Sequence, residues 1–296
     1  MTEMTEPSNQ TSVAAKRPSG RGTKERIDVL LVELGLAPSR EKAQAMIMSG
    51  IVFSGTTRID KSGQLVDRLA DIQVHGSNLP YVSRGGLKLE KGLAVFPVTL
   101  QDCRVLDIGA STGGFTDCAL QKGAAGVVAV DVGYGQLDWK LRQDPRVQVM
   151  EKTNARYLKL EDIGAPVDFV TIDVAFISLG KIFPALPGLM RPGAQGIALI
   201  KPQFEAGREN VGKKGVVRDP KVHLSVIENV LKEAEVSGLM PLGLDYSPIR
   251  GPEGNIEYLL WFGYKTEIEP ILEPDQSEKL VEKAFQTLKG EKRHDP

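Results

Sequence analysis

Cysteine, histidine and long apolar segments are scarce in this chain of 296 residues. It contains two cysteines and three histidines, and these do not cluster in the sequence. Two cysteines are too few for a disulfide framework. Because Cys103 and Cys118 fall in segments that we expect to be buried, a reduced, cytoplasmic setting is indicated. The scattered histidines argue against a metal site, and we expect no metal ion.

No apolar stretch approaches the roughly 20 residues that a membrane-spanning helix needs. The first 25 residues also lack the apolar core of a signal peptide. We therefore expect neither a secreted nor an integral membrane protein. The hydrophobic share of 41% and the charged share of 25% are those of an ordinary globular protein, long enough for one large domain and one small one.

An excess of charge of one sign is also absent, because the net charge is −1. Residues 1–92 carry 13 Lys and Arg against 10 Asp and Glu, a net of +3, which leaves −4 for the remainder. This asymmetry permits a nucleic-acid-binding N-terminal region without demanding one. Residues 1–23 are polar and rich in Ser, Thr, Pro and Gly, and we predict a disordered arm there.

The most informative segment present is 107–116, Asp-Ile-Gly-Ala-Ser-Thr-Gly-Gly-Phe-Thr. It follows an apolar run and predicts a strand, a tight glycine turn and a helix that begins near Gly114. The glycines are expected to let a ligand lie against bare backbone. A second apolar run, 127–130, ends on Asp131, an acid well placed to hold ribose hydroxyls.

The turn matches neither the dinucleotide pattern G-x-G-x-x-G nor the P-loop pattern. A nucleoside cofactor without a pyrophosphate fits better, and S-adenosylmethionine is the leading candidate. The alternative is a glycine-rich turn between strand and helix that binds nothing.

Strands and helices alternate beyond residue 81, which is typical of a doubly wound α/β sheet. The expected strands are 103–108, 127–131, 146–150, 167–173, 195–201, 240–246 and 256–262, the last returning antiparallel. The expected helices are one from Leu87 to Phe96 and others near 114–122, 135–142, 178–187, 220–237 and 276–289.

Residues 24–75 show a different and more compact pattern. A helix through Ile27 and Leu34 is expected to stop at Gly35, and Ser39 caps a second helix that leads into short strands. This pattern resembles the S4 RNA-binding domain. The resemblance implies that the second helix and the adjoining turn contact structured RNA. The residues that we predict to bind RNA are Arg26, Arg40, Lys42 and Arg84.

Four charged residues are expected at strand ends, beside glycine turns or on the helix before the sheet. Asp173 ends one apolar run, and Lys201 ends another directly before Pro202, which disfavours a helix there. Glu257 follows a glycine, and Lys88 lies on the helix that precedes the sheet. A lysine that ends a buried strand is costly unless it is paired or functional. Either one shared cleft or two independent ion pairs would satisfy these charges.

The order Lys88, Asp173, Lys201, Glu257 resembles the Lys-Asp-Lys-Glu tetrad of FtsJ-like ribose 2′-O-methyltransferases. Further segments are similar to the haemolysin-A-type (TlyA) ribosomal RNA methyltransferases, which join an S4 domain to an FtsJ-like domain. These segments are 82–86, 107–116, 131–137, 201–205 and 254–258. The match runs from about residue 24 to 263. Asp173-Val174-Ala175-Phe176 departs from the family's Asp-Leu-Ser-Phe, but the acid is retained.

The resemblance implies methyl transfer from S-adenosylmethionine to a ribose 2′-hydroxyl of cytidine in 16S and/or 23S ribosomal RNA. It gives Lys201 the task of activating the hydroxyl, as an amine or as an ammonium, with Asp173 orienting Lys201. Glu257 would orient Lys88 and the sugar. The cofactor-binding residues carried over are Asp107, Gly109, Ala110, Ser111, Gly113, Gly114, Phe115, Asp131 and Asn154. A turn-forming role explains Asn154 almost as well.

The predicted fold is therefore α/β, a Rossmann-like S-adenosylmethionine-dependent methyltransferase sheet with a small N-terminal α+β S4 RNA-binding domain. The expected divisions are a disordered arm at 1–23, the S4 domain and connector at 24–80, the methyltransferase domain at 81–268, and a C-terminal helix and tail at 269–296. The expected partners are ribosomal RNA or ribosomal subunits. Two alternatives remain: a non-catalytic RNA-binding assembly factor, and the membrane-active haemolysin of the family's historical name. The sequence offers the latter no span, signal or long cationic amphipathic helix.

Overall fold

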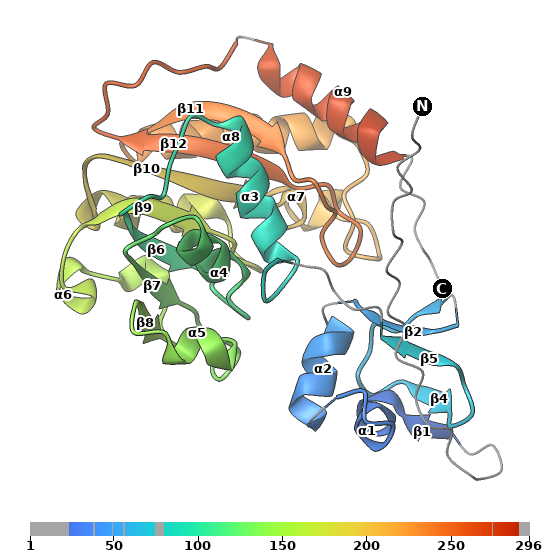
Figure 1. The fold of residues 1–296 in the computed structure, drawn as a ribbon. Helices are drawn as coiled ribbons and strands as arrows, with labels where there is room; N and C mark the ends of the chain where they lie inside the picture. The colour runs from blue at the N-terminus through green and yellow to red at the C-terminus, as the bar shows by residue number, and fades with distance from the viewer. Residues whose placement is uncertain are drawn as a thin grey trace, which may run out of the picture. The chain divides into compact units, whose positions relative to one another are not determined.

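The computed structural model describes residues 24–289, apart from 38, 49, 56, 75–79 and 274. The arm predicted at 1–23 lies outside the described residues. The described residues form two compact units, 24–74 and 80–289 (Figure 1).

The first unit packs two helices on short antiparallel strands, as the sequence predicts. Its core includes Ile27, Leu30, Leu31, Ala43 and Ile47, which are almost fully buried. β1 pairs with β4, and a second sheet has the order β3-β2-β5. The sequence did not predict β1 or β3, which are two or three residues long and largely polar. The elements are β1 (Lys24–Arg26), α1 (Ile27–Glu33), α2 (Arg40–Met48), β2 (Val52–Ser54), β3 (Thr57–Arg58), β4 (Leu65–Asp67) and β5 (Ile72–Val74).

The second unit is built on a seven-stranded sheet of order β11-β12-β10-β9-β6-β7-β8. Neighbouring strands from β10 to β8 are parallel, whereas β12 runs antiparallel to both β10 and β11. The predicted doubly wound sheet and its antiparallel return strand are thus confirmed. The strands are β6 (Arg104–Ile108), β7 (Gly126–Val130), β8 (Val147–Met150), β9 (Val167–Ile172), β10 (Met190–Ile200), β11 (Leu239–Tyr246) and β12 (Tyr258–Tyr264).

Helices cover both faces of this sheet, and each face has its own apolar core. Side chains alternate along each strand, so Val105 belongs to the core that includes side chains of α3, α4 and α5, while Leu106 belongs to the core that includes side chains of α8 and α9. None of the described helices is both long and apolar enough to cross a membrane. The helices are α3 (Gly85–Val95), α4 (Gly114–Gln121), α5 (Trp139–Gln143), α6 (Leu160–Ile163), α7 (Pro202–Glu205), α8 (Pro220–Val236) and α9 (Gln276–Lys289).

Prolines explain one difference from the predicted helices and one agreement with the sequence. The helix expected at 178–187 is two 3-10 turns, Leu179–Lys181 and Phe183–Gly188, because Pro184 and Pro187 lack the N–H that an α-helix needs. The expectation that Pro202 disfavours a helix at Lys201 is confirmed, because Lys201 is extended. The short helix α7 begins at Pro202 itself, whose fixed φ suits the first turn.

The approach of α3 to the sheet depends on a glycine that lacks a side chain. A Cβ at Gly86 would lie 2.3 Å from Cγ of Tyr81, a buried ring whose hydroxyl donates to Glu90. Because α3 also carries Lys88, this contact sets the position of a predicted site residue.

We expect Gly86→Ala to lower the free energy of unfolding by about 1–3 kcal/mol, because overpacking outweighs the better helix propensity of alanine, about 1 kcal/mol. Urea denaturation measures the change. Gly188→Ala is the matched control, since a Cβ there would meet no atom within 4 Å. Equal stability of the two variants would contradict this account of the packing.

Candidate active site

Four charged side chains meet at the carboxyl ends of β9 and β10. Nζ of Lys201 lies 2.5 Å from Oδ1 of Asp173, and Nζ of Lys88 lies 3.9 Å from Oδ2 of the same carboxylate. Lys88 also donates a hydrogen bond of 2.6 Å to Oε2 of Glu257. The charges therefore alternate in the order Glu257, Lys88, Asp173, Lys201. The shared carboxylate makes this one cluster rather than two independent ion pairs.

The strand order brings these residues to one edge of the sheet. Asp173 directly follows β9, where its N–H donates to the carbonyl oxygen of Ile108 at 2.9 Å. Lys201 follows β10, and Ile200 pairs with Tyr258 in the antiparallel β12. Since the chain enters β12 at the edge where it leaves β10, Glu257 lies at the same edge as Lys201. α3 adds Lys88 from the covering layer.

Burial and neighbouring charges shift the pKa values of Asp173 and Lys88 in opposite directions. Burial by itself would raise the pKa of Asp173, but the charges of Lys88 and Lys201 outweigh it and hold that pKa below its ordinary value. Burial would lower the pKa of Lys88, but Asp173 and Glu257 together raise it against the opposing charge of Arg84. Asp173 and Lys88 are thus both charged near neutral pH. Glu257 is buried, whereas the Asp173 side chain is 19% exposed and within reach of a substrate.

The glycine turn between β6 and α4 forms as predicted, and two of its glycines leave no room for a side chain. Gly109 and Gly113 have φ values of +85° and +96°. A Cβ at Gly109 would lie 2.6 Å from the carbonyl oxygen of Asp173, and one at Gly113 would lie 2.2 Å from Cδ1 of Leu141. The bare backbone at these two positions therefore accommodates other atoms of the protein, and the turn rests directly on Asp173.

Asp131 lies just beyond β7 and joins this turn to the next loop. Its Oδ2 accepts the N–H of Ser111 at 2.8 Å, and its Oδ1 accepts the N–H of Gly133 at 2.6 Å. Each carboxylate oxygen keeps a further lone pair for a ligand hydroxyl. The neighbouring Val132 presents an exposed apolar side chain. A carboxylate beside an apolar surface and a backbone turn fits the sugar and base of a nucleoside.

The other residues predicted to bind the cofactor are buried or already contact protein atoms. Asp107 is buried and accepts hydrogen bonds from the hydroxyls of Thr116 and Thr171, so it supports the turn from below instead of reaching a ligand. Phe115 and Ala110 are buried in the core. The side chain of Asn154 accepts the N–H of Arg156 and caps a 3-10 turn, which is the alternative role that the sequence left open. Gly114 packs against the hydroxyl of Ser83.

An exposed aromatic side chain three residues after Asp173 was not singled out from the sequence. Phe176 is 91% exposed and has a φ of +63°, which is strained for a residue with a large side chain. Its ring centroid lies 5.0 Å from that of Phe204, which follows Lys201 by three positions. The sequence signal that could have indicated Phe176 is an aromatic residue three positions after an acid that ends a strand. The contact between the rings of Phe176 and Phe204 becomes visible only in the folded structure.

The four residues predicted to bind RNA fall in both units. In the first unit, Arg26 and Arg40 form ion pairs with the same carboxylate, Asp28, while the backbone N–H of Lys42 donates to the hydroxyl of Ser39. In the second unit, Arg84 immediately precedes α3. In the described part of the chain, no group of three or more His, Cys, Asp or Glu side chains could hold a metal ion.

Two family models match the chain. The model of the FtsJ-like methyltransferase matches residues 81–264, and the model of the S4 domain matches residues 25–71. The first covers the second unit as far as the end of β12, and the second covers most of the first unit.

Several known proteins are similar over most of the chain. A Bacillus subtilis protein, YqxC, provisionally described as an rRNA methyltransferase, is 56% identical over 91% of this chain and 97% of its own length. The 16S/23S rRNA (cytidine-2′-O)-methyltransferase TlyA of Mycobacterium tuberculosis is 44% identical over 88% of this chain and 97% of its own. A solved structure from Streptococcus thermophilus, provisionally described as a hemolysin, has a TM-score of 0.72 and 47% identity, and the match covers 90% of this chain and 97% of that one.

The buried Asp107 makes stability depend on pH. Burial raises its pKa to about 6, although hydrogen bonds from Thr116 and Thr171 oppose the rise. The unfolded chain releases this proton near pH 4. The penalty for a buried charge is therefore absent below about pH 4 and complete above about pH 6, so the folded state loses stability as the pH rises through this window.

We expect Asp107→Asn to remove about 2–3 kcal/mol of this pH dependence, because asparagine stays neutral and the two threonine hydroxyls can reorient toward it. Urea unfolding of both proteins at several pH values between 4 and 7 measures the difference. Parallel stability curves for the two proteins would contradict the assignment.

Proposed function

Because this chain belongs to the FtsJ-like methyltransferase family and carries an S4 domain, we propose that it methylates the ribose 2′-hydroxyl of a cytidine in 16S and/or 23S ribosomal RNA in the cytoplasm. The observation that carries the proposal is the cluster of Lys88, Asp173, Lys201 and Glu257 at the edge of the sheet. The similarity to the Mycobacterium tuberculosis cytidine-2′-O-methyltransferase supports the choice of nucleotide.

The proposed cofactor is S-adenosylmethionine, which supplies an electrophilic methyl group when it is bound. Asp131 would hold the ribose hydroxyls, and Val132 would lie against the base. The turn that contains Gly109 contacts the backbone of Asp173 directly. This turn would therefore hold the cofactor beside the charged cluster, close to an acceptor hydroxyl, as an in-line transfer requires.

The residues of the cluster divide the work on the acceptor hydroxyl. Lys201 acts on its proton, either by accepting it as an amine or by stabilising the emerging oxygen anion as an ammonium. Asp173 holds Lys201 by the contact of 2.5 Å, and Lys88, fixed by Glu257, holds the other oxygen of Asp173. The carboxylate is thereby prevented from rotating. Action on the proton is worth roughly 10²–10⁴ in rate, and alignment contributes on the order of 7–11 kcal/mol.

Asp173→Ala is the central test of this function. We expect it to lower methyl transfer at least about 100-fold with little change in RNA binding, because it releases Lys201 without touching the first unit. The assay uses labelled S-adenosylmethionine, unmodified small and large ribosomal subunits, and mass spectrometry of the nucleosides. Glu161→Ala is the control, since Glu161 is exposed and pairs only with Lys159 among the described residues.

An active Asp173→Ala variant would overturn the assignment of the cluster. Absence of label on both subunits, in a protein that still binds the cofactor, would favour the non-catalytic assembly factor. A 2′-O-methylcytidine that disappears with Asp173→Ala would support the cofactor, the cluster and the substrate together.

Phe176 fits a role in holding the target base. A nucleotide that leaves its helical stack to enter the site loses its stacking neighbours, and an exposed ring next to Asp173 offers a new stacking partner. We expect Phe176→Ala to lower kcat/KM for the methylated subunit about 10- to 100-fold, because stacking on an aromatic side chain is worth about 1–3 kcal/mol per base. Phe176→Tyr should retain most of the activity. Equal losses in both variants, or none in either, would contradict base stacking.

A further inference from the structure

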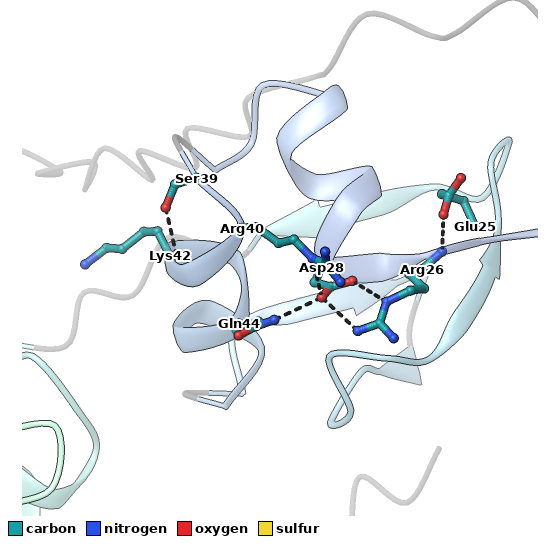
Figure 2. A network of polar contacts seen from close by, with 7 residues as sticks. All are labelled: Glu25, Arg26, Asp28, Ser39, Arg40, Lys42 and Gln44. Carbon is teal, nitrogen blue, oxygen red and sulfur yellow. Dashed lines mark hydrogen bonds and ion pairs between the residues drawn. The ribbon is translucent and has the colours of Figure 1, made fainter. Parts of the chain in front are cut away.

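A fully buried carboxylate in the first unit gathers side chains from two neighbouring elements. Asp28, in the first turn of α1, is 0% exposed. Its Oδ1 accepts from Nε of Arg26 at 3.0 Å, and its Oδ2 accepts from Nη2 of Arg26, Nε of Arg40 and Nε2 of Gln44, each at 3.0 Å. Figure 2 shows the carboxylate between Arg26, at the end of β1, and Arg40, at the start of α2.

The donors on Asp28 more than compensate for its burial. The paired hydrogen bonds from Arg26 hold the pKa of this carboxyl well below its usual range, and Gln44 and Arg40 act in the same direction against the effect of burial. Asp28 therefore stays charged at physiological pH. One negative charge holds two positive ones, so the group carries a net charge of about +1.

The two guanidinium groups face outward although their anchor is buried. The side chains of Arg26 and Arg40 are 43% and 51% exposed. Arg26 uses Nε and Nη2 on the carboxylate, and Arg40 uses only Nε, so Nη groups of both extend beyond it. The loop at Gly63 lies behind Arg26, where a Cβ would come within 3.4 Å of Nη1. The planar forks are thus fixed in direction before any ligand arrives.

We propose that Asp28 is a positioning residue for RNA binding, which sets Arg26 and Arg40 as a preformed pair for the phosphate oxygens of folded ribosomal RNA. The inference rests on the proposed function and adds to it the residue that organises the RNA-binding surface. Planar guanidinium groups suit the bidentate recognition of phosphate. Fixing two long side chains in advance removes the conformational entropy that RNA binding would otherwise have to overcome.

Charge alone predicts the opposite effect of Asp28. Neutralising it would raise the local charge from about +1 to about +2 and would strengthen binding to any polyanion. If positioning dominates, the same change weakens binding to the structured substrate, because the two arginines lose their common anchor. The direction of the change therefore separates the two accounts.

The first experiment compares wild type with Asp28→Asn in the full chain, using the methyl transfer assay with the ribosomal subunit that is modified. We expect KM for the subunit to rise about tenfold with kcat unchanged, while affinity for unstructured polycytidylate stays equal or increases. Asp60→Asn is the matched control, because Asp60 also pairs with an arginine in this unit, Arg58 at 2.6 Å, but on the surface. A KM for Asp28→Asn that is unchanged or lower would overturn the proposal.

A second variant guards against a folding defect. Arg40→Lys keeps the charge and the helix but removes the fork, and its half-exposed position tolerates the change. We expect a similar rise in KM, and we expect the double variant with Asp28→Asn to bind no worse than Asp28→Asn alone, because the two residues act together. If Asp28→Asn does not fold, Arg40→Lys decides. Wild-type KM in Arg40→Lys, or additive losses in the double variant, would contradict positioning.

Failure of this inference can be told apart from failure of the proposed function. Direct binding of each variant to small and large subunits, measured by filter retention without cofactor, does not depend on methyl transfer. Weaker binding by Asp28→Asn in a protein that methylates neither subunit would support the positioning role and count against the proposed reaction. Wild-type binding by Asp28→Asn in an active methyltransferase would overturn the positioning role alone.

Discussion

The contact between Gly109 and the backbone of Asp173 is the constraint on which the candidate active site depends. With a φ of +85° and no room for a Cβ, Gly109 lets the turn after β6 rest on the residue that ends β9. The same carbonyl that excludes a side chain at 109 belongs to the residue whose carboxylate holds both lysines. The turn proposed to bind the cofactor and the cluster proposed to act on the substrate therefore move as one piece. A shift of either would change the distance between methyl donor and acceptor, on which alignment depends.

The alternation of opposite charges explains how four ionisable side chains can lie together in a largely buried cluster. Removing any ion from water is costly, and only close opposite charges with hydrogen bonds offset that cost. Glu257 and Asp173 each contact Lys88, and Asp173 also contacts Lys201. The pair formed by Glu257 and Lys88 is the more buried and serves as a fixed base. Asp173 and Lys201 lie above it, where a hydroxyl could reach them.

Local sequence pattern was sufficient for the sheet and its main helices, because apolar runs and glycine turns are local signals. Together with a family resemblance, it singled out Lys88, Asp173, Lys201 and Glu257, which the structure brings into one cluster. It could not show why Gly109 is glycine, because the atom that excludes a side chain there lies on another strand. Phe176 and Asp28 were passed over for the same reason. Phe176 is exposed only because of how the loop after β9 folds, and the donors on Asp28 come from the end of β1 and from α2, which meet only in the folded unit.

Asp28 and Asp173 share one arrangement, a carboxylate paired with two cationic side chains, but the cations differ in their exposure. Each is a carboxylate that holds two positive side chains, and in each case those charges lower the pKa of the acid. At Asp173 the lysines are largely buried, so their charges are available to a substrate atom only inside the cluster. At Asp28 the acid is buried and the arginines are half exposed, so their charges are available at the protein surface. The exposure of the cations, rather than the pairing itself, is what distinguishes the proposed reaction site from the proposed recognition site.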